Sequence, residues 1–266
     1  VPVSGPEFLE HGGRTTCLEI AFSEAHAGRP DRIVIDCGTG AVRLGQQRSA
    51  EETSELLMLQ THMHWDHVQG FPFFGPFYNP AASVEFWGVD RNGASLAEVY
   101  NGQMTQPTFP VGMEVQAADV DFESLPERGE RQLGDVVLRW DEQCHPSGST
   151  AYRIEQDGRV FVFSGDVEVR HGGREALEGL AEGADVLVMD AQYFPDEYEK
   201  YEGFGHSTCL DAVDVAENCG VDRLYLTHHD PSHDDERLAE KPEIAREATN
   251  GGLEVDNARD DLTISL

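Results

Sequence analysis

The residues best suited to chemistry lie at positions 61–67, which read Thr-His-Met-His-Trp-Asp-His and directly follow an apolar run at residues 56–59. Imidazole binds zinc and similar divalent ions, and the Asp66 carboxylate adds an anionic oxygen ligand. Because so many ligands crowd one short loop, the spacing predicts two adjacent metals, an arrangement typical of hydrolysis. The alternative is a surface histidine cluster that collects stray metal.

Three further side chains follow apolar, β-branched or aromatic runs later in the chain: His145, Asp166 and His228. A buried strand delivers the side chain that comes after it to the edge of a sheet. Taken singly, each has an ordinary alternative, a turn residue for the aspartate and a capping or core group for each histidine. Their order after the first cluster favours a shared role as metal ligands.

These segments resemble the metallo-β-lactamase superfamily of metallohydrolases, from Ile33 to about Asp235, and the HxHxDH motif carries most of the resemblance. The motif order resembles the phosphodiesterase branch, which holds ribonuclease Z, the tRNA 3′-processing enzyme, and small cyclic-phosphate phosphodiesterases. The resemblance implies an α/β fold, the αββα four-layer sandwich, with a dimetal site at one edge. Beyond the cluster, the motifs are Ile35-Asp36-Cys37-Gly38-Thr39-Gly40, Cys144-His145-Pro146-Ser147-Gly148, Ser164-Gly165-Asp166, Gly205-His206-Ser207-Thr208 and Thr227-His228-His229.

The resemblance also implies a role for each ligand. One metal is expected on His62, His64 and His145, the second on Asp66, His67 and His228, with Asp166 bridging the two. Two divalent ions are expected, with zinc favoured and manganese or iron also compatible with these ligands. Asp66 would in addition orient the attacking oxygen, and His206 would serve as a further catalytic imidazole.

The assignment to the phosphodiesterase branch depends most on His206. It precedes an apolar stripe at near-helical spacing, so we expect it at a helix N-terminus capped by Ser207 or Thr208. There it could stabilise transition-state charge or protonate a leaving alkoxide. The alternative is a structural histidine hydrogen-bonded in a loop. His229 and His233 are ambiguous, and supporting or surface roles are favoured for both over ligation.

The chain is strongly acidic, with 50 Asp and Glu residues against 19 Lys and Arg residues and a formal net charge of −31. Such self-repulsion is tolerable where salt screens it, which favours the surface of a halophile over an acidic partner-binding tail. The acids are spread along the chain, as at Glu51-Glu52 and in the ranges 119–123, 127–130, 196–202 and 234–236.

This charge also bears on the substrate, because proteins that bind long polyanions neutralise phosphates with Lys and Arg. We therefore expect a metal-dependent hydrolase of a small or cyclic phosphodiester, with nucleic acid disfavoured. Three alternatives remain open: a tRNA 3′-processing endonuclease, a hydrolase of carboxylic esters, lactones or thioesters, and a di-iron redox or oxygen-sensing module.

Length and composition predict one metallo-β-lactamase-like domain over residues 1–266, and the start at Val1 suggests that a short N-terminal segment is missing. No apolar run approaches the roughly 18 residues of a membrane span. The five cysteines lack CxxC pairs, as in a reduced, cytoplasmic protein. A small-molecule substrate is expected, no membrane partner, and a homodimer by analogy with the family.

Apolar periodicity predicts alternating strands and helices. The expected strands are 16–21, 32–35, 55–59, 83–87, 136–140, 151–154, 160–163, 186–189, 223–226 and 262–266, and the expected helices are 67–70, 93–100, 174–182, 210–218 and 235–249. Residues 70–80 are too rich in Pro and Gly for regular structure and are strongly aromatic. With residues 100–110, they are expected either to wall the substrate pocket or simply to cover the core.

The charge gives a first prediction. The melting temperature should rise as KCl increases from dilute to molar, because screening relieves repulsion among the carboxylates. Thermal unfolding across a KCl series measures it, with an uncharged osmolyte as the control. A melting temperature indifferent to KCl would contradict the halophile interpretation.

Overall fold

The computed structural model describes residues 1–47 and 55–266, and the chain divides into two compact units. Unit 1 comprises Val1–Pro2 and Arg14–Pro126, and unit 2 comprises Val3–Gly13 and Glu127–Leu266. The acidic pair Glu51-Glu52 lies outside the described residues. A single domain over residues 1–266 stays a prediction.

Unit 1 contains a five-stranded sheet in the order β1-β2-β3-β4-β5. The strands are β1 (Leu18–Ala21), β2 (Arg32–Ile35), β3 (Glu55–Gln60), β4 (Ser83–Gly88) and β5 (Asp119–Ser124). β1 runs antiparallel to β2, whereas β2 to β5 are mutually parallel. Parallel strands end at the same edge of a sheet, so the residues that follow β2 and β3 are brought together there.

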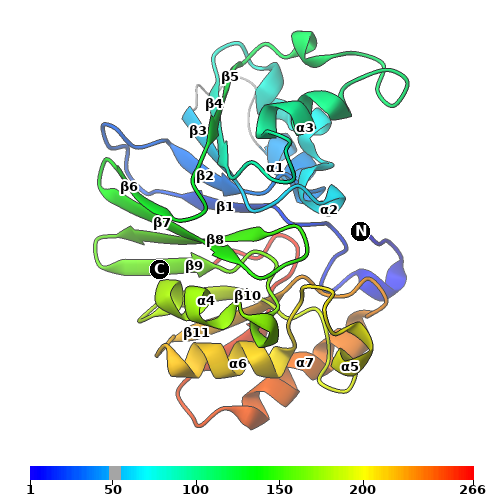
Figure 1. Cartoon of the computed structure of the whole chain (residues 1–266), viewed down its shortest axis with the longest axis vertical. Coiled ribbons are helices and arrows are strands. Elements are labelled where there is room, and N and C mark those ends of the chain that lie inside the picture. The colour runs from blue at the N-terminus through cyan, green and yellow to red at the C-terminus, as the bar shows by residue number, and fades with distance from the viewer. Residues whose placement is uncertain (48–54) are drawn as a thin grey trace. The chain divides into compact units, whose positions relative to one another are not determined.

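Helices of unit 1 lie on one side of this sheet, as Figure 1 shows. They are α1 (Gly40–Gln47), α2 (Trp65–Val68) and α3 (Leu96–Gln103), with 3-10 turns η2 (Phe71–Phe73), η3 (Gly75–Tyr78) and η4 (Met113–Val115). The core between them is aromatic: Phe71 packs with its ring centroid 4.4 Å from that of Tyr100 and 4.7 Å from that of Phe77.

The aromatic stretch at residues 70–80 therefore belongs mainly to the core. Phe71, Phe74 and Phe77 are all buried, whereas Phe73 and Tyr78 are exposed. The expectation that this stretch lacks regular structure is wrong, because η2 and η3 place these phenylalanines about one turn apart, on the side that faces the sheet.

Unit 2 contains a seven-stranded sheet in the order β12-β11-β10-β9-β8-β7-β6. The strands are β6 (Gly129–Leu133), β7 (Val136–Gln143), β8 (Ser149–Gln156), β9 (Arg159–Phe163), β10 (Val186–Asp190), β11 (Arg223–Thr227) and β12 (Glu254–Asn257). β6 to β9 form an antiparallel meander, and β9 to β12 are parallel. The carboxyl ends of β9, β10 and β11 therefore meet at one edge.

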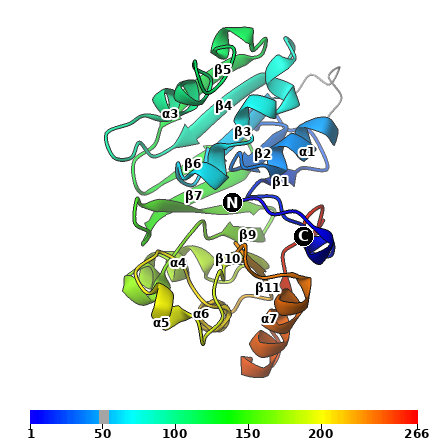
Figure 2. The same ribbon diagram turned by 90° about the vertical axis from the view of Figure 1, so that its right-hand side faces the viewer.

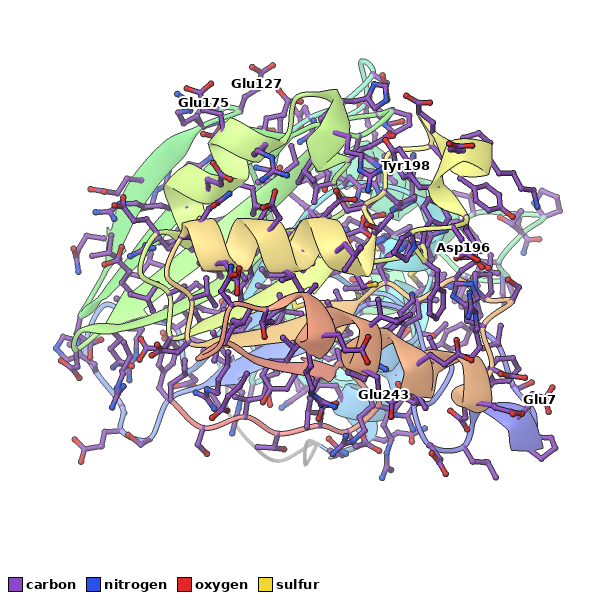
Figure 3. The ribbon with its side chains drawn as sticks, turned by 90° about the horizontal axis from the view of Figure 1, so that it is seen from below. Glu7, Glu127, Glu175, Asp196, Tyr198 and Glu243 are labelled. Atoms are coloured by element: carbon purple, nitrogen blue, oxygen red, sulfur yellow. The ribbon has the colours of Figure 1, made fainter. Side chains whose placement is uncertain are left out.

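The helices of unit 2 are α4 (Arg174–Ala181), α5 (Tyr198–Tyr201), α6 (Cys209–Asn218) and α7 (Asp235–Ala248), with 3-10 turns η1 (Pro6–Phe8) and η5 (Val169–His171). α6 and α7 lie side by side in Figure 3. The labelled Tyr198 is buried. Five acidic side chains labelled in that view are exposed and point outward: Glu7, Glu127, Glu175, Asp196 and Glu243.

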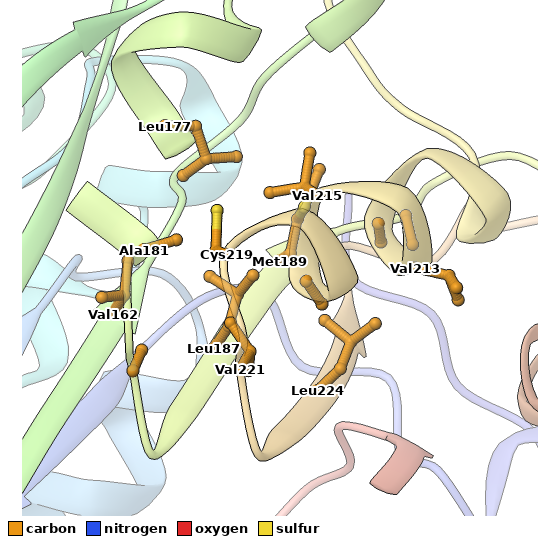
Figure 4. Close-up of a cluster of buried hydrophobic side chains, with 14 of the residues drawn as sticks. Val162, Leu177, Ala181, Leu187, Met189, Val213, Val215, Cys219, Val221 and Leu224 are labelled. Carbon is orange, nitrogen blue, oxygen red and sulfur yellow. The ribbon is translucent and has the colours of Figure 1, made fainter. Parts of the chain in front are cut away.

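Aliphatic side chains from α4 and α6 pack against the central strands of unit 2, as Figure 4 shows. Leu187 and Met189 of β10 lie at the centre of this cluster and are fully buried. Strands buried this deeply consist of continuous apolar runs. The sequence pattern therefore predicted the bounds of β9, β10 and β11 accurately.

The N-terminal segment of unit 2 lies beside the start of α7 (Figure 2). The Asp235 carboxylate accepts hydrogen bonds from the backbone amides of Glu10, at 2.8 Å, and of His11, at 2.9 Å. This carboxylate also contacts the His11 ring, so it fixes the segment against the first turn of the helix.

Most predicted elements are present, within a few residues of their expected bounds. The predicted strand at residues 262–266 is wrong: the edge next to β11 is taken by β12, and residues 262–266 remain at least partly exposed. β5, β6 and β12 escaped prediction because they carry many charged residues, and α1 did so because its segment is rich in Gly and Gln.

The packing predicts that Leu187→Ala lowers the free energy of unfolding by about 2 to 5 kcal/mol, since it leaves a cavity in a fully buried cluster. Denaturant unfolding measures the loss. Leu9→Ala is the matched control, because Leu9 is 79% exposed, and it should change stability by less than about 0.5 kcal/mol. Equal effects of the two substitutions would contradict this core assignment.

Candidate metal centre

The first cluster lies in unit 1, where β3 ends and α2 begins. His62 and His67 are buried, and the His62 ring centroid lies 4.5 Å from that of His64 and 4.2 Å from that of His67. The Asp66 carboxylate lies 3.7 Å from His67 Nε2. All four predicted ligands of this segment therefore gather within a single turn.

Asp36, the residue that follows β2, holds this turn in place through its side chain. Its buried carboxylate contacts His67 Nδ1 at 2.7 Å and accepts hydrogen bonds from the amide of Thr61, at 2.8 Å, and from the Thr61 hydroxyl. Burial raises the pKa of Asp36, although the contacts to His67 and Thr61 oppose that shift. A carboxylate on Nδ1 fixes the ring orientation and leaves Nε2 as the ligand atom.

The loop after β2 packs tightly against the metal motif. The Cys37 amide donates to His67 O at 2.9 Å, and the Gly70 amide donates to Cys37 O at 2.8 Å. A Cβ atom on Gly38 would lie 2.4 Å from Asp66 O, so only glycine allows this approach. The backbone around Asp66 and His67 is thus held by the neighbouring strand end.

The second cluster lies in unit 2, at the edge where β9, β10 and β11 end. Asp166, Asp190, His206 and His228 each offer a ligand atom, and these atoms all lie within 4.8 Å of one another. His228 Nε2 lies 3.2 Å from Asp166 Oδ2, and its Nδ1 lies 2.9 Å from Gln192 Oε1. His228 adopts a left-handed backbone with φ of 57°, which is uncommon for this residue type.

Asp190 does for His206 what Asp36 does for His67. The fully buried Asp190 carboxylate contacts His206 Nδ1 at 2.7 Å and accepts a hydrogen bond from the Val167 amide at 3.0 Å. The His206 ring is stacked with that of His228, at a centroid distance of 4.7 Å. Thr208, one of the two caps that the sequence predicted, is the N-cap of α6 and accepts a hydrogen bond from the Asp211 amide, so His206 stands two residues before the N-cap.

His145 lies in the turn between β7 and β8. Its Nδ1 contacts Gly205 O at 2.9 Å, and its ring centroid lies 5.1 Å from that of His206. The motif that contains His206 therefore also orients His145.

His229 and His233, which the sequence left ambiguous, belong to neither cluster. His229 Nδ1 lies 3.5 Å from the ammonium of Lys241, and His233 Nε2 lies 3.1 Å from Glu197 Oε1. Burial lowers the pKa of both imidazoles. Lys241 is fully buried and donates to Ala191 O and to Gln192 O, which fixes the loop after β10.

The donors in both clusters suit borderline divalent metal ions. Imidazole nitrogens and carboxylate oxygens predominate, and two of the imidazoles have Nδ1 fixed by a carboxylate. Carboxylates on Nδ1 are characteristic of metal sites, in which such outer partners set the orientation and basicity of a ligand such as His67.

Asp36 and Asp190 were not identified as site residues from the sequence. The signal was present, because each ends a buried strand in the same way as the predicted ligands do. Gln192 was also missed, and nothing in its local sequence marks it.

Several known proteins resemble this chain in sequence and in fold. Residues 31–229 match the family described as a beta-lactamase superfamily domain. A ribonuclease Z from Haloarcula marismortui is 25% identical over 252 residues, covering 74% of this chain and 76% of that protein. The crystal structure of human tRNase Z, short form, has a TM-score of 0.65 at 20% identity and covers 96% of this chain and 93% of its own.

The metallo-β-lactamase fold protein YhfI from Bacillus subtilis has a TM-score of 0.63 at 19% identity, covering 90% of this chain and 91% of its own. These two structures confirm the α/β fold with two sheets, and the match at residues 31–229 confirms the family recognised from the sequence. The chain therefore belongs to the beta-lactamase superfamily and is a metal-dependent hydrolase with His and Asp clusters able to hold divalent ions.

Proposed function

We propose that this protein is a dimetal phosphodiesterase that acts on a small or cyclic phosphodiester. The observation that carries the proposal is the 2.7 Å contact between His206 Nδ1 and the buried Asp190. It places an oriented imidazole among groups suited to metal, where a leaving group would need a proton. The relatives named ribonuclease Z support cleavage of a phosphodiester bond.

The proposed ligands are those that the family resemblance assigns. His62, His64 and His145 would hold one ion, and Asp66, His67 and His228 the other, with Asp166 shared between them. Zinc suits this ligand set, and manganese or iron would also be accepted. When bound, such a metal pair polarises the phosphoryl oxygens and activates water for in-line attack.

The chain's own residues would supply orientation and the proton. Asp36 and Asp190 hold the rings of His67 and His206, so neither imidazole has to reorganise during the reaction. With Nδ1 directed to Asp190, the proton that His206 gives to a departing alkoxide comes from Nε2. Asp190 would stabilise the imidazolium form that precedes this transfer.

The distribution of positive charge favours a small substrate. Of the two lysines, Lys241 is fully buried and Lys200 donates to the Tyr201 hydroxyl at 3.0 Å. Many arginines of unit 2 are engaged by carboxylates, which limits what they offer to a polyanion: Arg139 with Glu130, Arg159 with Asp185, Arg170 with Asp211 and Arg174 with Asp214. Within the described part of unit 2, pairing of this kind reduces the positive charge available to neutralise a long phosphate backbone.

A tRNA 3′-processing endonuclease is the second candidate, because curated relatives from several organisms are named ribonuclease Z. A substrate panel separates the two. We expect turnover of bis(p-nitrophenyl) phosphate and of a 2′,3′- or 3′,5′-cyclic nucleotide, with weak or no cleavage of a pre-tRNA at molar KCl.

A panel result of the opposite kind would change the conclusion. Efficient cleavage of pre-tRNA after its acceptor stem would favour the endonuclease. Turnover of a lactone or thioester without turnover of any phosphodiester would contradict the phosphodiesterase proposal. Asp166→Ala protein, assayed on every substrate, controls for a contaminating hydrolase.

The role of His206 gives a sharper prediction. His206→Ala should lose roughly 10² to 10⁴ in kcat on an alkyl phosphodiester, because the leaving alkoxide needs a proton. On bis(p-nitrophenyl) phosphate the loss should be much smaller, because p-nitrophenolate leaves unprotonated. Steady-state kinetics on both substrates, with metal content measured in parallel, test this contrast.

Two matched variants complete the experiment. His26→Ala removes an exposed histidine outside both clusters and should leave both rates unchanged. Asp166→Ala should lose metal and both activities together, since it removes a ligand. Equal losses on the two substrates by His206→Ala with full metal content would rule out the general-acid role.

A further inference from the structure

Glu168 is a buried carboxylate of unit 2 that lies outside the assigned ligand set, two residues after Asp166. Its side chain is 3% exposed and accepts three short hydrogen bonds. Oε1 accepts from the Tyr198 hydroxyl at 2.6 Å and from the Gly203 amide at 2.8 Å, and Oε2 accepts from the Gly205 amide at 2.8 Å.

These bonds connect Glu168 to the loop that leads into His206. Gly205 is held on both sides: its amide donates to Glu168, and its carbonyl oxygen lies 2.9 Å from His145 Nδ1. Gly205 has φ of 93°, and a Cβ atom there would lie 2.3 Å from His145 Nδ1. The loop therefore has little freedom to shift without displacing the His145 ring.

The backbone of Glu168 also bonds to the residue that precedes His145. Its amide donates to Cys144 O at 2.9 Å, immediately before His145 in the chain. One residue thus touches the turn that carries His145 and the loop that carries His206, while its own segment carries Asp166.

We infer that Glu168 is a positioning residue that fixes His145 and His206 relative to Asp166 by clamping the Gly203 to Gly205 loop. The inference relies on the proposed function only in treating His145 and Asp166 as metal ligands.

The chemistry of the clamp requires a carboxylate. The three hydrogen-bond partners of the side chain are all donors, His171 Nε2 lies 3.6 Å from Oε1, and a carboxylate offers only acceptor positions. An amide in this place would set its NH2 group against at least one of these donors.

A second link joins the same segments independently of the Glu168 side chain. The Ser207 hydroxyl donates to Val167 O at 2.6 Å and accepts from the Val169 amide at 3.3 Å. A change at Glu168 should therefore alter the position of the loop more than the stability of the unit.

The test compares Glu168→Gln with Tyr198→Phe in the full chain loaded with Co²⁺. Glu168→Gln should change the cobalt d–d absorption bands and weaken Co²⁺ affinity by about 10- to 100-fold, the usual effect of disturbing an outer partner of a metal ligand, because Glu168 holds Gly205, the partner of His145. Tyr198→Phe removes one donor but keeps both glycine contacts, so its spectrum should match that of the wild type and its affinity should change by less than about threefold.

Kinetics on bis(p-nitrophenyl) phosphate supply a second readout. Glu168→Gln at saturating Co²⁺ should lower kcat by about 10- to 100-fold while KM stays within about threefold of the wild type, because the ligands shift and the substrate surface does not. A wild-type spectrum and Co²⁺ affinity in folded Glu168→Gln would overturn the inference, whatever the activity.

Two further outcomes are decisive. If Glu168→Gln fails to fold, Glu168→Asp takes its place, because the shorter carboxylate cannot reach both Gly203 and Gly205. An altered cobalt spectrum of Glu168→Asp then supports the clamp. An unaltered spectrum overturns it. If wild-type protein binds Co²⁺ but hydrolyses no phosphodiester, the proposed function fails, and the spectra still decide the role of Glu168.

Discussion

Two buried contacts between a carboxylate and an imidazole Nδ1, Asp36 with His67 and Asp190 with His206, are the interactions on which both clusters depend. Each measures 2.7 Å and involves an aspartate that is almost inaccessible to solvent. Burying a carboxylate is costly unless it is hydrogen-bonded, so these aspartates tolerate few other arrangements of their neighbours. Each pair therefore fixes the orientation of one ring of its cluster.

The backbone is locally strained at two strand ends that position site residues. Asp36 has φ of 61° and His228 has φ of 57°, both in the left-handed region that residues with a side chain rarely adopt. Hydrogen bonds hold both residues in place, because the Thr61 amide donates to the Asp36 carboxylate and His228 Nδ1 lies 2.9 Å from Gln192 Oε1. Strain of this kind persists where surrounding contacts over-determine the conformation, as the parallel strand ends do here.

Charged side chains differ in role between the surface and the interior of unit 2. Acidic side chains populate the outside of unit 2, and several arginines are neutralised by them. Lys241, by contrast, is buried and bonds the carbonyl groups of Ala191 and Gln192, next to the residues that hold His206 and His228. The pKa of Lys241 is lowered by burial to about 8, so this rare lysine serves the architecture of the site and not its surface.

The sequence by itself determined the family and the buried strands and predicted the ligands of the first cluster, because HxHxDH is a local pattern and fully buried strands are continuous apolar runs. It misjudged residues 262–266 and missed charged strands such as β5, since a local pattern does not say which edge of a sheet is already occupied. Only the tertiary structure paired Asp36 with His67, 31 residues apart, and Asp190 with His206, 16 apart. The carboxylate of Glu168 likewise finds its partners 30 to 37 residues away, at positions that no periodicity encodes.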